Sequence, residues 1–257
     1  MWVIVAVGLA LINAAQFVSS MMKERVAKDE LAEVLSPQAT KDRFHQLFYR
    51  DPSTLWKNSW FGVLTEQNPN DVWVTQEIMW QEKPDFVVEC GAFRGGSALL
   101  WAAILKEINP EGRVITIDIN DIGPEARQHP LFNERIEFLL GSSVAPEMVA
   151  KVHEKVGGKK ALVILDSDHH KAHVLKELQA YADLVPVGGY LIVQDSNING
   201  HPMTVDEHDF SKEYSGQEGP YEAVEAFVAQ DKRFEVDLSK ERLMLTMNPH
   251  GFLRRVK

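Results

Sequence analysis

A short apolar segment followed by closely spaced glycines constrains the fold of this chain more than any other stretch. Residues 86–90 form a largely apolar, partly β-branched run that predicts a buried strand. Gly91, Gly95 and Gly96 follow, and glycine permits a tight turn with close approach of a ligand because it has no Cβ. Apolar residues at helical spacing over 97–108 then predict a helix. The stretch therefore predicts a strand, a glycine-rich turn and a helix N-terminus that together can hold a nucleotide-like ligand.

Two acidic residues at predicted strand ends indicate which ligand this is. The glycine spacing is not the dinucleotide fingerprint, and no lysine follows to make a phosphate loop. Glu89 closes the first strand, where an acid disfavours a pyrophosphate and suits a cationic group. Asp118 ends the next predicted strand, where a carboxylate can accept hydrogen bonds from both ribose hydroxyls. S-adenosylmethionine carries a sulfonium, an ammonium and a ribose, so this pair resembles the class I methyltransferase site.

The rest of the chain alternates predicted strands with predicted helices. Continuous apolar runs are typical of a parallel sheet buried on both faces, and right-handed crossovers then give a doubly wound sheet. We expect an α/β fold with a mostly parallel, seven-stranded, Rossmann-like sheet over 84–257, preceded by a helical segment over 23–83. The predicted strands are 86–90, 113–118, 136–140, 161–166, 189–194 and a final antiparallel pair at 234–238 and 242–247. Helices are expected at 97–108, 144–155, 171–184 and 220–229, and residues 196–219 are expected to form a lid or substrate loop.

Charge and composition exclude some functions and suggest a membrane anchor. The formal net charge of −10 argues against a nucleic-acid partner, which needs a basic surface. The single cysteine, Cys90, excludes an internal disulfide and a cysteine-rich zinc site. Residues 1–22 carry no charged side chain, and this length is about what a helix needs to span a bilayer. The cations that follow directly would keep the globular part in the cytoplasm, although an amphipathic N-terminal helix is the alternative.

A second group of polar residues follows the fourth and fifth strands of the predicted sheet. Asp166 and Asp168 follow one strand, and Gln194 and Asp195 follow the next. Carboxyl ends of parallel strands meet at one edge of a sheet, where carboxylates need a cation to be tolerated together. Oxygen ligands of this kind suit Mg²⁺ or Ca²⁺. The alternative is that Asp166 or Asp168 caps the helix that follows.

Histidines near these acids have several interpretations. His169 and His173 are four residues apart, a spacing that can bind a transition metal, but no glutamate lies between them as in metalloproteases. A surface or cofactor-facing role is therefore favoured for both. His201 lies in the loop after the fifth strand and is the candidate general base, because its ordinary pKa is near physiological pH. The alternative for His201 is that it packs the predicted lid.

Three longer phrases resemble the cephalosporin hydroxylase and rhamnosyl O-methyltransferase family over roughly residues 55–250. They are Glu89-Cys-Gly-Ala-Phe-Arg-Gly-Gly-Ser97, Leu165-Asp-Ser-Asp-His169 with His173-Val-Leu-Lys-Glu-Leu178, and Val193-Gln-Asp-Ser-Asn-Ile-Asn-Gly-His-Pro202. The resemblance implies a class I methyltransferase fold, S-adenosylmethionine, and a divalent metal beside the methyl donor. It places the metal on Asp168, Gln194 and Asp195, with Asp166 as an alternative first ligand. The family pattern has an acid where this chain has Gln194, and a neutral amide attracts a cation less strongly.

These observations lead to an S-adenosylmethionine-dependent O-methyltransferase that uses Mg²⁺ and acts on a hydroxyl of a sugar, glycolipid or small natural product. Asp118 would hold the ribose, and Ser142 or Ser143 the adenine. Asp168 and Asp195 would orient the acceptor through the metal, and His201 would take the proton. The methionine part would contact Asp166 and the strand end and turn, namely Glu89, Gly91, Ala92, Phe93, Gly95 and Ser97. Glu89 would act on the methionine ammonium either directly or through backbone and water. The alternatives are a metal-dependent oxygenase on the same scaffold and a non-catalytic, membrane-anchored cofactor-binding protein; the oligomeric state is left open, a homo-oligomer included.

Overall fold

The computed structural model describes residues 18–29, 31–32, 36–50, 57–198 and 217–257. The chain divides into two compact units, residues 1–44 and 45–257. Residues 18–29 are helical, and helix α2 runs from Pro37 to Arg50. No helix among the described residues is long and apolar enough to cross a bilayer. Residues 1–17 of the expected anchor lie outside the described residues, so the anchor stays a prediction.

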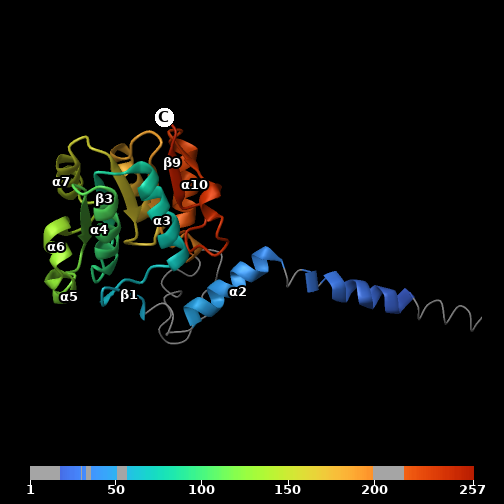
Figure 1. Cartoon of the computed structure of the whole chain (residues 1–257). Coiled ribbons are helices and arrows are strands. Elements are labelled where there is room, and N and C mark those ends of the chain that lie inside the picture. Colours follow the sequence, from blue (N-terminus) through green and yellow to red (C-terminus); the bar gives the residue numbers. More distant parts are fainter. Residues whose placement is uncertain (1–17, 30, 33–35, 51–56, 199–216) are drawn as a thin grey trace, which may run out of the picture. The chain divides into compact units, whose positions relative to one another are not determined.

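The second unit contains a seven-stranded sheet in the order β5-β4-β3-β6-β7-β9-β8 (Figure 1). Strands β3 to β7 are parallel, whereas β9 pairs antiparallel with both β7 and β8. The strands of the sheet are β3 Phe86–Cys90, β4 Arg113–Asp118, β5 Ile136–Leu140, β6 Ala161–Leu165, β7 Tyr190–Val193, β8 Phe234–Val236 and β9 Phe252–Arg255. This confirms the predicted doubly wound, mostly parallel sheet. A separate two-stranded hairpin consists of β1 Ser59–Trp60 and β2 Val63–Leu64.

Helices cover both faces of the sheet. One apolar cluster packs α7, α8 and α10 against one face, and a second packs α3, α4, α5 and α6 against the other. In Figure 1, α3 and α4 lie in front of the sheet. The helical elements are α3 Pro69–Glu82, α4 Gly96–Ile108, α5 Pro124–Gln128, α6 Pro130–Arg135, α7 Pro146–Val156, α8 Lys171–Tyr181, η2 Ala182–Leu184, η3 Ser196–Ile198, α10 Pro220–Gln230 and η4 Leu238–Glu241. The strands β6 and β7 are buried at every position, which explains their continuous apolar sequences.

The last strand is where the sequence prediction was wrong. The sequence predicted the last strand at 242–247, but the structure places β9 at Phe252–Arg255. Residues 242–247 instead form a non-regular segment in which Thr246 and Met247 bind Asp71 of α3. Met247 is buried in this segment, whereas Leu243 and Met244 are exposed, so the segment is held by its contacts with α3 and not by pairing with a strand.

Candidate functional site

A cavity of about 390 Å³ lies at the carboxyl ends of β3 to β7. This is the edge of an open α/β sheet where ligands ordinarily bind. Ten of the residues predicted for the site line it, namely Gly91, Phe93, Ser97, Asp118, Ser142, Ser143, Asp166, Asp168, Gln194 and Asp195. Glu89, Ala92 and Gly95 are absent from the lining. His201 lies outside the described residues, so its role as a base stays a prediction.

The glycine-rich turn is shaped by Asp118. One oxygen of this carboxylate, Oδ2, accepts the backbone N–H groups of Ala92 and Phe93 at 3.0 and 2.8 Å. The other oxygen accepts the backbone N–H of Asn120 at 2.8 Å. Asp118 therefore joins the end of β4 to the turn after β3, while its carboxylate still lines the cavity.

Gly91 is required because another strand end lies against it. Its φ is +97°, a conformation that disfavours side chains, and a Cβ there would lie 1.8 Å from the backbone oxygen of Asp166. The backbone N–H of Asp166 in turn donates to the carbonyl of Cys90 at 2.7 Å. The turn that begins at Gly91 is thus in direct contact with the end of β6.

Glu89 lies behind the turn and not in the cavity. Its side chain is fully buried, and its two carboxylate oxygens accept hydrogen bonds from Trp101 Nε1 at 2.8 Å and Thr116 Oγ1 at 2.6 Å. Burial raises the pKa of Glu89 to about 7. Glu89 is therefore not placed for a direct contact with a bound methionine ammonium, and its indirect action through the backbone stays a prediction. Glu89 instead joins β3, α4 and β4 beneath the turn.

A second buried carboxylate, that of Glu177, lies behind the part of the cavity wall formed by Ser143 and Ser167. Glu177 of α8 is fully buried, and its Oε1 accepts hydrogen bonds from Ser143 Oγ at 2.5 Å and Ser167 Oγ at 2.6 Å. His173 Nε2 lies 3.3 Å from the same oxygen. This hydrogen bond, which outweighs burial, raises the pKa of His173. Sequence reasoning missed Glu177, because nothing in a helical Lys-Glu-Leu phrase distinguishes a buried glutamate from an exposed one.

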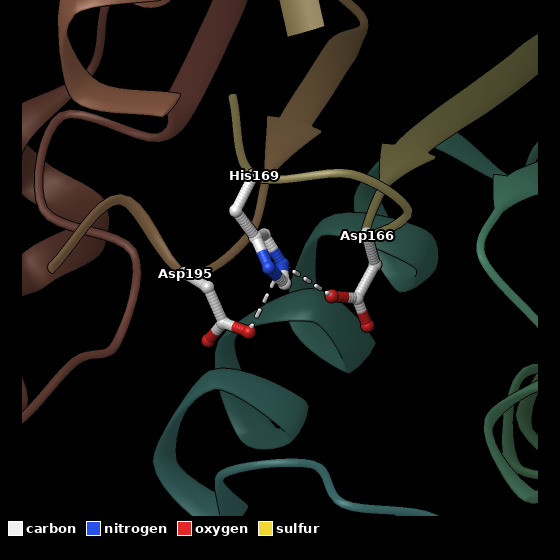
Figure 2. A group of neighbouring side chains, drawn as sticks. All are labelled: Asp166, His169 and Asp195. Carbon is white, nitrogen blue, oxygen red and sulfur yellow. Dashed lines mark ion pairs between the residues drawn. The ribbon is translucent and has the colours of Figure 1, made fainter. Parts of the chain in front are cut away.

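The side chains of Asp166, His169 and Asp195 converge between the ends of β6 and β7 (Figure 2). His169 Nε2 lies 3.4 Å from Asp195 Oδ2 and 3.7 Å from Asp166 Oδ1. One potential ligand atom from each of the three lies within 4.8 Å of the others. The structure therefore fits a divalent cation by geometry and by donor type.

Burial and mutual charge shift the pKa values of this cluster. Burial raises the pKa of Asp195 to about 7, with the Asp166 carboxylate as the next cause. Burial likewise raises the pKa of Asp166. Burial alone would lower the pKa of His169, but its hydrogen bond to Asp166 and the Asp195 charge outweigh this and raise it. The charges of the two carboxylates and the imidazole thus act on one another, and two adjacent carboxylates favour a cation between them.

Asp168 lies outside this cluster of titratable groups, whereas Gln194 lines the cavity beside it. Asp168 Oδ1 accepts hydrogen bonds from the backbone N–H of His170 at 2.8 Å and from its Nδ1 at 2.6 Å. The N-cap of α8 is His170, without a side-chain cap, so the capping role considered for Asp166 or Asp168 is wrong. Gln194 forms two reciprocal amide hydrogen bonds with Gln67, both at 2.8 Å. The ligand set of Asp168, Gln194 and Asp195 stays a prediction, and Asp166, its alternative first ligand, lies beside Asp195 in the cluster.

Two further cavity residues, Glu66 and Gln67, were not found from the sequence. Gln67 Nε2 also donates to Asp166 Oδ2 at 3.0 Å. Burial, followed by the Asp166 and Asp195 charges, raises the pKa of Glu66 to about 7. Both residues come from the segment between β2 and α3, and no local pattern there points to the edge of a sheet that begins later in the chain.

Comparisons with known proteins agree with this architecture. An open, mostly parallel sheet with an antiparallel end, a glycine turn and acids at successive strand ends defines an α/β fold of the methyltransferase type. The model of the rhamnosyl O-methyltransferase/CmcI family matches residues 53–256, and the chain belongs to this family. A rhamnosyl O-methyltransferase of Mycobacterium leprae is 32% identical over 222 residues, covering 83% of this chain and 90% of the relative. The corresponding protein of Mycobacterium bovis is 33% identical over 225 residues, covering 84% of this chain and 85% of the relative.

Solved structures share the fold at lower sequence identity. A CmcI structure described with Mg and SAM is 21% identical, with a TM-score of 0.57 and coverage of 79% of this chain and 78% of the other. A CmcI structure described with SAH is 19% identical, with a TM-score of 0.53 and coverage of 78% and 83%. These similarities confirm the α/β fold that the sequence predicted.

Proposed function

We propose that the chain is an S-adenosylmethionine-dependent O-methyltransferase that acts on a hydroxyl group of a sugar unit with the help of a divalent cation. One observation carries this proposal above the others. A single cavity contains both a glycine turn held by Asp118 and a cluster of metal-ligand type at Asp166, His169 and Asp195. Membership of the rhamnosyl O-methyltransferase/CmcI family supports it, and the name of the curated relatives supports a rhamnose-type sugar as the acceptor.

The methyl donor would bind along the β3 and β4 ends. Asp118 would accept hydrogen bonds from the ribose hydroxyls, while its bonds to the turn fix the carboxylate in place. Ser142 and Ser143 line the next part of the cavity and would contact the adenine. The methionine part would bind the turn from Gly91 to Ser97, with Glu89 acting only through the turn that it supports.

The cation would bind at Asp166 and Asp195, which lie side by side at the ends of β6 and β7. A bound divalent cation lowers the pKa of an acceptor hydroxyl and fixes its orientation. Gln67 donates to Asp166 and so holds that carboxylate in its orientation. Since methyl transfer is an in-line displacement, placing the acceptor oxygen in line with the methyl group supplies much of the rate.

Calorimetric titration with S-adenosylmethionine tests the binding part of the proposal. Asp118→Ala should weaken binding about tenfold to a hundredfold, because hydrogen bonds to a charged group are worth about 1.5–3 kcal/mol. Asp121→Ala is the matched control, since this exposed acid pairs with Arg127 and lies outside the cavity lining. Absence of binding by the wild-type chain, or equal binding by both variants, would contradict the proposal.

Transfer of a labelled methyl group to a rhamnosylated acceptor tests the catalytic part. Transfer by the wild-type chain would exclude the non-catalytic alternative. Binding of the donor without transfer to any sugar acceptor would leave that alternative standing and contradict the proposed activity. The oxygenase alternative has no support, because the observed cluster has one histidine and two carboxylates whereas the usual iron oxygenase triad has two histidines and one carboxylate.

A further inference from the structure

We propose that Glu66 and Asn248 bind the acceptor sugar through hydroxyl groups that neighbour the one to be methylated. The carboxylate of Glu66 would accept a hydrogen bond from such a hydroxyl, and the side-chain amide of Asn248 would donate one. The acceptor would therefore need a free hydroxyl next to the reacting one. This inference rests on the proposed function and concerns which part of the acceptor the cavity recognises; it leaves the cation and its ligands unchanged.

Glu66 brings an unsatisfied carboxylate oxygen to the cavity wall. The residue lines the cavity, and its Oε1 is buried without a hydrogen-bond partner in the part of the chain that the structure describes. The charges of Asp166 and Asp195 act on Glu66, which places it close to the acids of the proposed cation site. A buried acceptor without a partner costs free energy, and a hydroxyl of a bound ligand would supply the missing donor.

The backbone at Glu66 is held in a strained conformation. Its φ is +53°, in the left-handed region that residues other than glycine rarely adopt. The residues on either side are fixed, because Thr65 N–H donates to the carbonyl of Asn58 at 2.8 Å. Asn58 Nδ2 in turn donates to the carbonyl of Gln67 at 3.0 Å. Strain of this kind persists where the surroundings impose it and is concentrated at ligand sites, so it supports a binding role for Glu66.

Asn248 supplies the opposite hydrogen-bonding group from a distant part of the chain. Its side chain lines the same cavity and is 1% exposed. Its Oδ1 accepts the backbone N–H of Asp195 at 3.0 Å, which fixes the orientation of the amide and leaves Nδ2 as the free group. Nδ2 is buried and finds no hydrogen-bond partner among the described residues. An unpaired donor and the unpaired acceptor of Glu66 thus belong to one cavity.

Hydroxyl groups match this pair of atoms, because a hydroxyl both donates and accepts hydrogen bonds. Side-chain rotations are common on binding and would turn the two polar atoms towards a ligand in the cavity. The hydroxyl to be methylated would lie at the cation, beside Asp166 and Asp195. Glu66 and Asn248 both adjoin these acids, so the groups that they reach are the next hydroxyls along the sugar ring.

The charge of the cavity limits the sugar further. The described lining residues include six acids but no lysine or arginine; the acids are Glu66, Asp71, Asp118, Asp166, Asp168 and Asp195. A uronic acid would bring another carboxylate into this lining and would be repelled. The acceptor class that follows is a neutral sugar with at least two adjacent free hydroxyls.

Monodeoxy analogues of p-nitrophenyl α-L-rhamnoside test the inference, with labelled S-adenosylmethionine and Mg²⁺. The wild-type chain should show a kcat/KM at least about tenfold lower for an analogue that lacks a hydroxyl next to the methylated one, because buried polar groups then stay unpaired. Glu66→Ala should lower kcat/KM for the intact rhamnoside about tenfold to a hundredfold and should no longer discriminate against that analogue. Glu66→Gln keeps an acceptor oxygen and should restore part of the discrimination.

Asn248→Asp keeps the acceptor for the Asp195 N–H but removes the donor, so it should also lose discrimination against an analogue that lacks a neighbouring hydroxyl. Glu235→Ala and Asn133→Asp are the matched controls, because both residues are exposed and lie outside the cavity lining. They should behave as the wild type. None of the variants should alter the calorimetric titration with S-adenosylmethionine.

Calorimetric binding of the intact and deoxy rhamnosides in the presence of S-adenosylhomocysteine gives a second measurement that needs no methyl transfer. The wild-type comparison of the analogues stands even where a variant does not fold. Equal use of the intact and all deoxy sugars by the wild type, full discrimination by the Glu66→Ala chain, or absence of rhamnoside binding would overturn the inference. Donor binding is measured separately, so the failure of this inference differs from a failure of the proposed function.

Discussion

At the scale of single residues, Gln194 shows how one neutral side chain sets the charge of the cavity. It is 5% exposed, and its side-chain amide forms two hydrogen bonds with Gln67, which in turn donates to Asp166. An acid at this position would add a further carboxylate to those of Asp166, Asp195 and Glu66. The neutral amide pair therefore limits the number of carboxylates that are close together in the cavity.

We expect Gln194→Glu to lower the stability of the metal-free protein by about 2 kcal/mol, because it removes a buried hydrogen bond and adds an uncompensated charge. The same change should raise the affinity for divalent cations, since ligand charge increases binding. Urea unfolding with and without Mg²⁺ measures both effects. Gln128→Glu adds the same charge at an exposed position of α5 and should change neither quantity. An unaltered metal-free stability in the Gln194 variant would show that the amide pair is unimportant.

At the scale of elements, helix α3 is fixed to the segment before β9 by buried and exposed contacts. Asp71 is 3% exposed and accepts hydrogen bonds from Thr246 Oγ1 at 2.5 Å and Met247 N–H at 2.8 Å. Glu77, on the outer side of the same helix, pairs with Arg242. Both contacts join the same two parts of the chain, but only one is shielded from water.

The two contacts should differ widely in their contribution to stability. Asp71→Ala should cost about 3 kcal/mol, because it leaves a buried hydroxyl and a buried N–H without their acceptor. Glu77→Ala, which removes a partly exposed ion pair, should cost less than about 1 kcal/mol. Urea denaturation at neutral pH compares them. Equal losses in the two variants would mean that Asp71 does not hold the helix in place.

The elements also show which parts of the fold could be predicted from the sequence. Strands β3 to β7 were predictable because each is a continuous apolar run, which is typical of a strand buried on both faces of a parallel sheet. Strand β9 was not predictable, since Phe252 to Arg255 is short and takes its place only by pairing with β7 and β8. The same limit applies to the site. Strand-end acids such as Asp118 and Asp166 can be recognised locally, whereas the roles of Glu66, Gln67 and Glu177 depend on contacts distant in sequence.

At the scale of the whole molecule, buried acids give the metal-free protein an unusual pH dependence. Burial raises the pKa of Asp71 to about 6, of Glu89 to about 7 and of Glu82 to about 8. In the unfolded chain such groups lose their protons near pH 4. Between pH 4 and these raised values the folded protein holds more protons, so its stability falls as the pH rises.

We therefore expect the melting temperature of the metal-free protein to be about 5 °C lower at pH 8.5 than at pH 5.5. Glu82→Gln should reduce this difference, because the amide keeps the side chain neutral at both pH values. The exposed Glu235→Gln variant should behave as the wild type. Differential scanning calorimetry at the two pH values measures the effect, and a melting temperature that rises towards pH 8.5 would contradict the assignment.

The contact between Gly91 and the backbone of Asp166 has a thermodynamic consequence. The turn proposed to hold the methyl donor is in contact with the strand end proposed to hold the cation, so we expect a shift of one backbone to displace the other. A ligand that orders one of them thereby prepares the other, and such coupling between two binding equilibria is always reciprocal. Whatever factor the cation adds to the affinity for the donor, the donor adds to the affinity for the cation. The cellular concentration of either ligand would then set how much of the protein is loaded with the other.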